Sequence, residues 1–157
     1  MVTLTIFTPS YNRAHTLPRL YESLKRQTSN DFSWMVIDDG STDNTEDIVS
    51  DWKNQDNNFD IIYIKKENGG LHTGYNCAIE HCDTELMMCI DSDDFAPDYL
   101  VERVINFWKE NGSDEYAGIV GLDCYLDGKV IGDMLPHQKS VNLIDLLLGK
   151  YNSVNGD

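Results

Sequence analysis

Short apolar runs alternate with amphipathic stretches along most of the chain. Five runs rich in β-branched and aromatic residues predict strands at residues 2–7, 32–37, 61–64, 86–90 and 117–125. Apolar residues at helical spacing predict helices at residues 16–27, 43–52, 74–82 and 98–109. A small hairpin at residues 126–131 and a short apolar helix at residues 143–148 follow. The alternation predicts an α/β fold with a mostly parallel central sheet flanked by helices.

Polar, turn-forming residues follow each of the first four predicted strands. They occupy residues 8–13, 38–41, 68–70 and 91–94. In an open parallel sheet, ligands bind outside the carboxyl ends of the strands. One such turn is common, but four successive turns delivered to the same edge predict a binding site there.

The composition indicates a globular domain with a strongly acidic charge balance. The 157 residues suit a single domain spanning residues 1–157, and 41% of them are hydrophobic. The 27 acidic residues against 12 basic ones give a net charge of −15, which argues against nucleic acid as a partner. If the ligand is a phosphate compound, so acidic a protein needs an added cation to hold it.

The chain shows no sequence signal for membrane insertion or export. No apolar run is long enough to span a bilayer, and no basic segment precedes the first strand. Cys77, Cys82, Cys89 and Cys124 lack metal-ligand spacing, so we expect reduced thiols in the core of a cytoplasmic protein. The apolar helix at residues 143–148 leaves peripheral contact with the inner face of the membrane open as an alternative.

The strongest candidate for metal binding is Asp91-Ser92-Asp93. Side chains alternate along a strand, so Asp91 and Asp93 are expected to point the same way. Two converging carboxylates repel each other unless a cation lies between them, and oxygen ligands favour Mg²⁺ or Mn²⁺. The alternative is an acidic loop that caps the helix after Pro97, a role that suits Asp94 in particular.

A second acidic pair, Asp38-Asp39, follows an apolar strand. Residues 41–43 suit the start of the next helix, and Asp38 suits a local structural role. The carboxylate of Asp39 could instead accept a hydrogen bond from the ring N–H of a nucleobase, such as a pyrimidine.

Other candidate ligand contacts come from the turns after the first and third strands. Tyr11 can stack on a planar base, and Arg13 can bind a phosphate through two hydrogen bonds. Gly69 and Gly70 allow close approach of the backbone to a ligand. Plain turns with a solvated arginine remain the alternative for these segments.

The strings TPSYNR, IDDGSTD, NGG and IDSDD, in this order, resemble the family 2 glycosyltransferases of the GT-A fold. The resemblance runs from Thr5 to about Phe95. It implies a Rossmann-like fold, a nucleotide-sugar donor that is commonly UDP-linked, a divalent metal, and transfer with inversion to a glycan, polysaccharide or lipid-linked acceptor. It also implies nucleotide contacts from Thr8, Pro9, Tyr11, Arg13, Asp39, Gly69, Gly70 and Asp91, and metal contacts from Asp91 and Asp93.

The sequence departs from the family pattern at two points. Members often carry an Arg-Asn pair after the NGG-like loop, whereas Tyr75 precedes Asn76 here. An inverting transferase needs a general base, and no base motif is identified after residue 94, so the acceptor part of the fold is expected to be missing. A nucleotide-sugar-binding module without catalytic activity is therefore the alternative function. Acidic phosphotransfer domains are disfavoured because the first strand ends without an aspartate.

Overall fold

The computed structural model describes residues 2–132, 140–142, 144–145 and 148. By its internal contacts the chain divides into two compact units, Met1–Ser113 and Asp114–Asp157. Within the described residues, no helix is both long and apolar enough to cross a bilayer.

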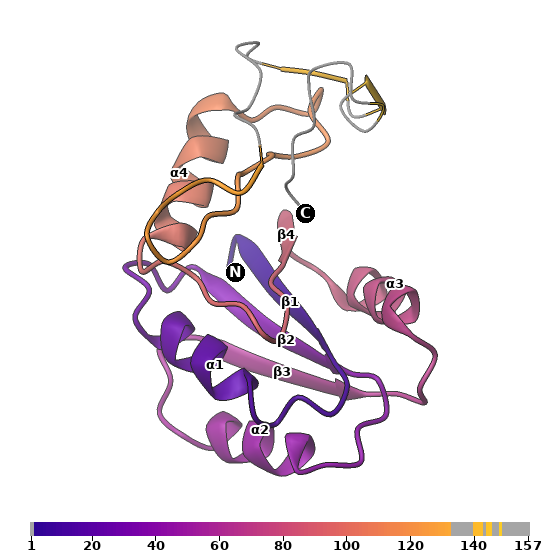
Figure 1. The fold of residues 1–157 in the computed structure, drawn as a ribbon. Coiled ribbons are helices and arrows are strands. Elements are labelled where there is room, and N and C mark those ends of the chain that lie inside the picture. The colour runs from indigo at the N-terminus through magenta and orange to yellow at the C-terminus, as the bar shows by residue number, and fades with distance from the viewer. Residues whose placement is uncertain (1, 133–139, 143, 146–147, 149–157) are drawn as a thin grey trace. The chain divides into compact units, whose positions relative to one another are not determined.

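The first unit is an α/β sheet domain in which strands and helices alternate strictly (Figure 1). Its elements are β1 Leu4–Ser10, α1 Leu17–Lys25, β2 Phe32–Asp38, α2 Thr45–Lys53, β3 Asp60–Lys65, α3 Leu71–His81, β4 Leu86–Cys89 and α4 Leu100–Asn111. The strand order is β3-β2-β1-β4, and every pairing is parallel. The α/β fold with a parallel central sheet, expected from the alternating pattern, is confirmed.

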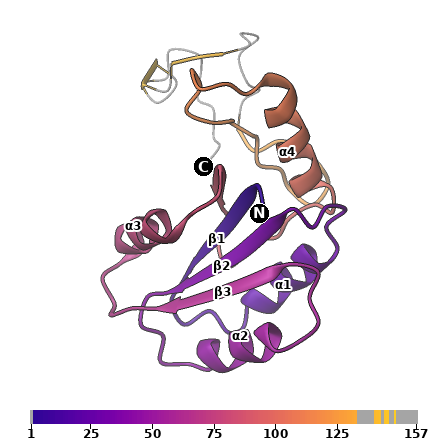
Figure 2. The same ribbon diagram turned by 180° about the vertical axis from the view of Figure 1, so that it is seen from behind.

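One face of the sheet is covered by α1 and α2, with α4 joining the same hydrophobic cluster (Figures 1 and 2). Alternate residues of the strands supply its floor because side chains alternate between the two faces of a sheet. The cluster includes Leu4, Ile6, Leu20, Leu24, Trp34, Val36, Val49, Val101 and Ile105. Burial of these side chains is the main source of stability for this face.

The opposite face is covered by α3 and carries a smaller cluster of Phe7, Met35, Ile37 and Ala78. A Cβ atom added to Gly74 would lie 3.5 Å from the Cβ of Pro9. At Gly74 the backbone of α3 therefore lies close enough for a methyl group to make an ordinary van der Waals contact with the sheet.

β1 extends three residues beyond its predicted end and includes Pro9. A proline inside a strand usually removes a ladder hydrogen bond. Here β4 pairs with β1 only as far as Phe7, and the backbone of Phe7 faces β4. Because backbone groups alternate in direction along a strand, Pro9 faces the same side, beyond the end of β4, and the missing N–H removes no pairing.

The second unit differs from the sequence prediction. The strand expected at residues 117–125 is wrong, because in this segment only Cys124 forms a β-bridge, with Val130. An apolar run with strand propensity still needs a partner strand to form a ladder. The predicted hairpin is present as that antiparallel bridge, closed by a hydrogen bond from the Gly128 amide to the Tyr125 carbonyl at 2.8 Å.

Two further expectations concern the predicted apolar helix and the cysteines. The predicted helix at residues 143–148 falls partly on residues 143, 146 and 147, which lie outside the described residues. None of the four cysteines forms a disulfide; Cys77, Cys82 and Cys89 are only partly buried and Cys124 is exposed, so the expectation that all four are core thiols is wrong.

The close packing of α3 predicts that enlarging Ala78 destabilises the fold. Ala78 is fully buried, so Ala78→Leu should lower the free energy of unfolding by about 1–3 kcal/mol through overpacking. Ile79, the next residue, is 60% exposed, and Ile79→Leu should change stability by less than about 0.5 kcal/mol. Urea denaturation of both variants measures the difference. An Ala78→Leu protein as stable as the parent would contradict close packing of α3.

Candidate functional site

The loops that follow the four strands leave the sheet at one edge, because all strands run parallel (Figure 1). The amide of Asp39 donates to the carbonyl of Ser10 at 2.8 Å, which joins the ends of β1 and β2. The amide of Lys66 donates to the carbonyl of Asp38 at 2.9 Å, which joins the ends of β2 and β3. The expected gathering of polar turns at one edge of the sheet is therefore observed.

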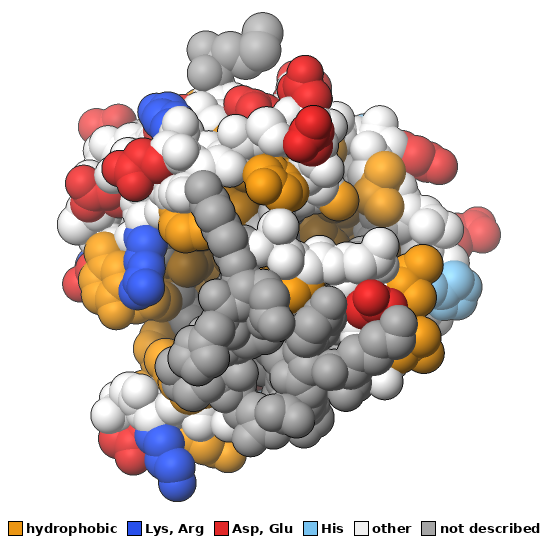
Figure 3. Space-filling model, turned by 90° about the horizontal axis from the view of Figure 1, so that it is seen from above, with side chains coloured by type: hydrophobic (Ala, Val, Ile, Leu, Met, Phe, Trp, Pro, Cys, Tyr) orange, Lys and Arg blue, Asp and Glu red, His pale blue; other side chains and the backbone are white. Residues whose placement is uncertain are grey.

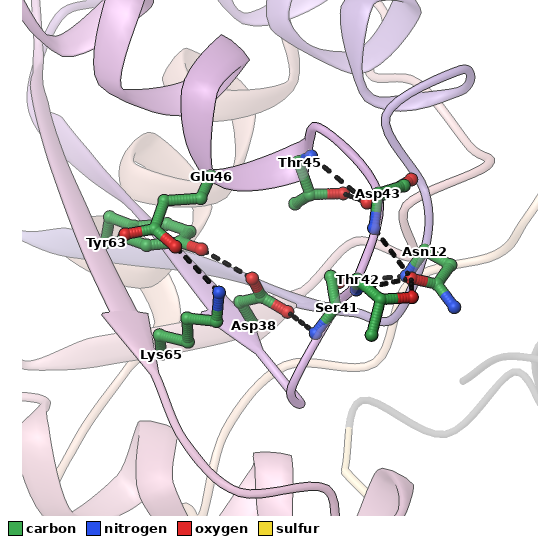
Figure 4. Close-up of polar contacts among 9 residues, drawn as sticks. All are labelled: Asn12, Asp38, Ser41, Thr42, Asp43, Thr45, Glu46, Tyr63 and Lys65. Carbon is green, nitrogen blue, oxygen red and sulfur yellow. Dashed lines mark hydrogen bonds and ion pairs between the residues drawn. The ribbon is translucent and has the colours of Figure 1, made fainter.

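Asn12 connects the loop after β1 to the loop after β2 (Figure 4). Its side-chain oxygen accepts hydrogen bonds from the amides of Thr42 at 2.8 Å and Asp43 at 3.3 Å. Its own amide donates to the hydroxyl of Ser41 at 2.9 Å. Asn12 has a φ of 54°, a left-handed conformation that asparagine tolerates better than most residues.

Asp38 is fully buried at the end of β2 and serves the local structure, as the sequence suggested. Its carboxylate accepts hydrogen bonds from the amide of Ser41 at 2.7 Å and the hydroxyl of Tyr63 at 2.5 Å (Figure 4). Burial and then the hydrogen bond to Asp38 raise the pKa of Tyr63 well above its ordinary value. Tyr63 therefore stays a neutral hydrogen-bond donor to this carboxylate.

Asp43 lies at the start of α2. Its carboxylate accepts hydrogen bonds from the amide of Thr45 at 3.1 Å and from the Thr45 hydroxyl at 2.6 Å. It also accepts one from the amide of Ala14 at 3.1 Å, a second link to the loop after β1. The prediction that residues 41–43 supply the cap of this helix is wrong, because the N-cap residue is Asn44; Asp43 instead binds Thr45, the first residue of α2.

The carboxylate of Asp39 organises the loop after β3. It accepts hydrogen bonds from the amides of Gly69 at 3.0 Å and Gly70 at 2.8 Å, and it forms an ion pair with the ammonium group of Lys66. The side-chain amide of Asn68 donates to the Asp39 carbonyl at 2.9 Å. Asp39 thus fixes the two glycines that the sequence placed at the ligand.

The same contacts keep Asp39 ionised. Burial pushes the pKa of Asp39 upward, but the hydrogen bonds from Lys66, Gly69 and Gly70 outweigh it and hold the pKa below its ordinary value. Only 10% of the side chain is exposed. The protein therefore presents a fixed negative charge with a small accessible surface at this point.

Gly70 has a φ of 87° at the start of α3, a left-handed backbone conformation that favours glycine because glycine has no side chain. A Cβ atom on Gly69 would lie 2.8 Å from the hydroxyl oxygen of Thr73. The shape of the loop therefore favours glycine at residue 70 through its backbone conformation, and at residue 69 a larger residue would require the Thr73 side chain to shift.

Asp91, Asp93 and Asp94 bring carboxylate oxygens within 4.8 Å of one another, and all three residues are exposed. The expectation that strand alternation aligns the first two is wrong, because β4 ends at Cys89. A turn aligns them instead, closed by a hydrogen bond from the Asp94 amide to the Asp91 carbonyl at 3.0 Å. This turn also adds Asp94 to the cluster.

The alternative role of this acidic loop as a helix cap is not supported. α4 begins at Leu100, and no side chain caps its first turn. The cluster therefore has no structural task at the start of that helix.

The segment between the cluster and α4 is anchored on α1 and on the residues that follow this helix. The side chain of Gln27 donates to the Pro97 carbonyl at 2.8 Å and accepts from the Val101 amide at 3.0 Å. The hydroxyl of Ser23 accepts from the Ala96 amide at 3.0 Å. Gln27 and Ser23 are buried, so these contacts fix where the chain leaves the acidic turn.

Two arginines from the first loop and helix reach the acidic turn. Arg13 forms an ion pair with the Asp93 carboxylate at 3.6 Å, and the guanidinium of Arg19 donates to the Asp93 carbonyl. Arg13 and Asp93 are both substantially exposed, so the pair contributes little to stability. It does place a positive charge beside the carboxylate cluster.

The other residues predicted to contact the ligand differ in how deeply they are buried. Thr8 is fully buried, and its hydroxyl accepts a hydrogen bond from the Trp34 indole at 3.0 Å, so ligand contact by Thr8 stays a prediction. Pro9 is half-buried, whereas Tyr11 is 50% exposed and available for stacking. Tyr75 packs edge-on against Phe7, with ring centroids 4.9 Å apart.

Sequence reasoning missed Lys66, Asn12 and Arg19. Lys66 follows a strand in an acidic chain and next to a polar turn, which is a usable signal for a charge partner. The bridging contacts of Asn12 depend on the left-handed backbone, which sequence alone does not reveal. Arg19 lies on a helix face like many solvated arginines.

The surface as a whole is acidic, and acidic side chains predominate over lysine and arginine on the face in Figure 3. A groove of about 350 Å³ lies on α4, lined by Tyr99, Glu102, Arg103, Asn106, Phe107 and Glu110. It contains none of the residues predicted to bind a ligand. The candidate site is at the strand ends, where exposed carboxylates, a buried carboxylate and an exposed aromatic ring come from loops that hydrogen bonds hold together.

The sequence matches the family described as Glycosyl transferase family 2 over residues 5–134. The poly(ribitol-phosphate) beta-glucosyltransferase of Bacillus spizizenii is 33% identical over 117 residues, which cover 73% of this chain and 18% of that protein. The poly(ribitol-phosphate) beta-N-acetylglucosaminyltransferase TarP of Staphylococcus aureus is 28% identical over 127 residues, which cover 78% of this chain and 38% of that protein.

Solved structures show the same fold. The crystal structure of S. aureus TarS 1–349 in complex with UDP-GlcNAc matches with a TM-score of 0.63 and 28% identity, covering 72% of this chain and 33% of that one. This chain thus spans less than half the length of each of these relatives. The family match includes the four strands and the polar loops that follow them. The chain belongs to glycosyl transferase family 2.

Proposed function

We propose that the first unit binds the nucleotide-sugar donor of a glycosyltransferase at the carboxyl edge of its sheet. The observation that carries the proposal is the acidic turn, where Asp91, Asp93 and Asp94 bring carboxylate oxygens within 4.8 Å of one another. Three exposed negative charges at this distance repel each other, so the turn is suited to a ligand that brings positive charge. A metal-bound diphosphate has that property.

The residues present fit a divalent cation. Carboxylate oxygens are the ligands that Mg²⁺ and Mn²⁺ favour, and such ions keep coordination positions open for phosphate oxygens. Asp91 and Asp93 would hold the cation, and Asp94 lies close enough to assist. Once bound, the cation would neutralise negative charge on the leaving diphosphate.

Neighbouring loops would bind the nucleoside and the diphosphate. The exposed ring of Tyr11 would stack on the base, and the ionised Asp39 would accept a hydrogen bond from a ring N–H. Arg13 already lies beside the acidic turn, so its guanidinium would contact the diphosphate.

The proposed donor is a UDP-sugar. A crystal structure of TarS, with 28% identity to this chain, contains UDP-GlcNAc. The acceptor would be a glycan or polymer, since curated relatives are named as transferases acting on poly(ribitol-phosphate). Direct attack of an acceptor hydroxyl on the anomeric carbon would invert its configuration. We assign no residue of the chain as the general base.

The metal role predicts that UDP binding depends on both the cation and Asp93. In calorimetric titrations with Mn²⁺, we expect UDP to bind and a chelator to weaken binding strongly. Asp93→Asn should weaken Mn²⁺-dependent binding about 10-fold or more, because a charged ligand is lost. Asp98→Asn is the matched control, since Asp98 is an exposed aspartate paired with Arg26 outside the cluster.

The same titration separates the proposal from its rivals. Binding of UDP that is equally tight with Mn²⁺ and with chelator would contradict the metal role but keep the nucleotide site. Titration of GDP, CDP and ADP tests the choice of nucleotide. A folded protein that binds none of these nucleotides would contradict the donor site itself.

The proposed displacement predicts that the transferred sugar has the opposite anomeric configuration to the donor. Proton NMR of the product formed from an α-linked UDP-sugar should show a β-linked anomeric proton. Retention of configuration would contradict direct displacement. Donor binding without transfer to any glycan or polyol-phosphate acceptor would favour a non-catalytic nucleotide-sugar-binding module.

A further inference from the structure

Lys66 forms an ion pair with Asp39 at the point where the proposed function places the nucleobase. The two side chains are 22% and 10% exposed, so the pair is largely shielded from water. Lys66 also donates to the carbonyl of Glu67 at 2.6 Å, which restrains its ammonium group from the other side. The ammonium group is therefore held beside the carboxylate instead of moving freely in solvent.

Both groups keep hydrogen-bonding capacity beyond these contacts. A lysine ammonium has three N–H donors. Among the described residues, Lys66 uses two of them, on Asp39 and on the Glu67 carbonyl. An ionised carboxylate offers about four acceptor positions. Asp39 fills three of them within the described structure, with Lys66, Gly69 and Gly70. Within the described structure, one N–H of Lys66 and one acceptor position of Asp39 therefore remain, the latter on the oxygen Oδ2 that Gly70 contacts.

We propose that Lys66 and Asp39 together recognise the imide edge of the uracil base. Asp39 accepts the hydrogen bond of the uracil N3–H, and Lys66 donates to a carbonyl oxygen next to it. This inference rests on the proposed donor site and adds Lys66 as a residue that determines base specificity.

Hydrogen-bond chemistry explains why such a pair selects among bases. Uracil presents an N–H beside a carbonyl, which complements a carboxylate beside an ammonium group. Cytosine presents a ring nitrogen acceptor in place of the N3–H, which leaves Asp39 unmatched; its 4-amino group also leaves Lys66 unmatched if Lys66 contacts the 4-position. Buried polar groups left without partners make such discrimination strong. Guanine shares the N–H and carbonyl pattern, so the pair does not separate UDP from GDP.

Lys66 could instead serve only to hold Asp39 and the glycine loop in place. Sulfur analogues of the ligand separate the two roles. 2-thio-UDP and 4-thio-UDP keep the N3–H but replace one carbonyl oxygen with sulfur, a much weaker acceptor. Only a lysine that contacts the replaced oxygen makes the protein sensitive to this change.

The experiment measures the affinities of UDP, 2-thio-UDP, 4-thio-UDP and CDP with Mn²⁺ for the parent protein, Lys66→Met and Lys65→Met. The parent should bind UDP about 10-fold tighter than one thio analogue, because that analogue loses a hydrogen bond to a charged donor. In Lys66→Met this ratio should fall towards one, and the preference for UDP over CDP should narrow. Lys65 pairs with Glu46 instead, so Lys65→Met should keep both ratios.

Two results would overturn the proposal. One is a Lys66→Met protein that binds UDP and both thio analogues more weakly by the same factor, which indicates a structural role alone. The other is a parent protein that binds UDP and both analogues equally. Lys66→Gln, which keeps an N–H donor, should retain part of the discrimination and serves if Lys66→Met does not fold. Absence of all nucleotide binding by the folded parent would contradict the donor site as well.

Discussion

Asp38 ends the central strand β2 and Asp39 follows it, and neither buried carboxyl group can be accommodated unless its oxygens are hydrogen-bonded. Asp38 meets this requirement through Tyr63 and the Ser41 amide, which fixes the path of the chain towards α2. Asp39 meets it through Lys66 and the glycine amides, which fixes the loop after β3. The conformation of the proposed binding edge therefore follows from the need to hydrogen-bond two buried carboxyl groups.

The carboxylates of the acidic turn after β4, in contrast to Asp38 and Asp39, are not buried. They are exposed, so water stabilises each charge, and their mutual repulsion remains. The turn is nevertheless held in position from both sides. Arg13 and Arg19 contact Asp93, and the buried Gln27 and Ser23 anchor the segment that follows. On the proposed function, this anchored turn would bind a cation, and it supplies no side-chain cap to α4.

The sequence predicted the fold well where a local pattern reports directly on structure. Periodicity predicted the order of strands and helices up to α4 correctly. The polar turns after apolar runs supplied the residues of the candidate site. Prediction failed where the outcome depends on distant partners. β1 continues through Pro9 because β4 is short, and residues 117–125 form no strand because only Cys124 finds a partner there. The alignment of Asp91 with Asp93 was expected from strand geometry, but it arises from a turn. Lys66 was missed because its role depends on Asp39, which is distant in the chain.

The charges around the site also explain why an acidic protein can have an anionic ligand. The cations of this edge are already engaged, since Arg13 pairs with Asp93 and Lys66 pairs with Asp39. If a diphosphate drew Arg13 away without any other change, Asp93 would lose its partner among carboxylates that already repel one another. A divalent cation that arrives with the diphosphate removes this conflict, because it replaces the positive charge that Arg13 supplied and leaves the guanidinium to contact the phosphates. On the proposed function, the acidic turn and Arg13 therefore favour binding of cation and diphosphate together over binding of either alone.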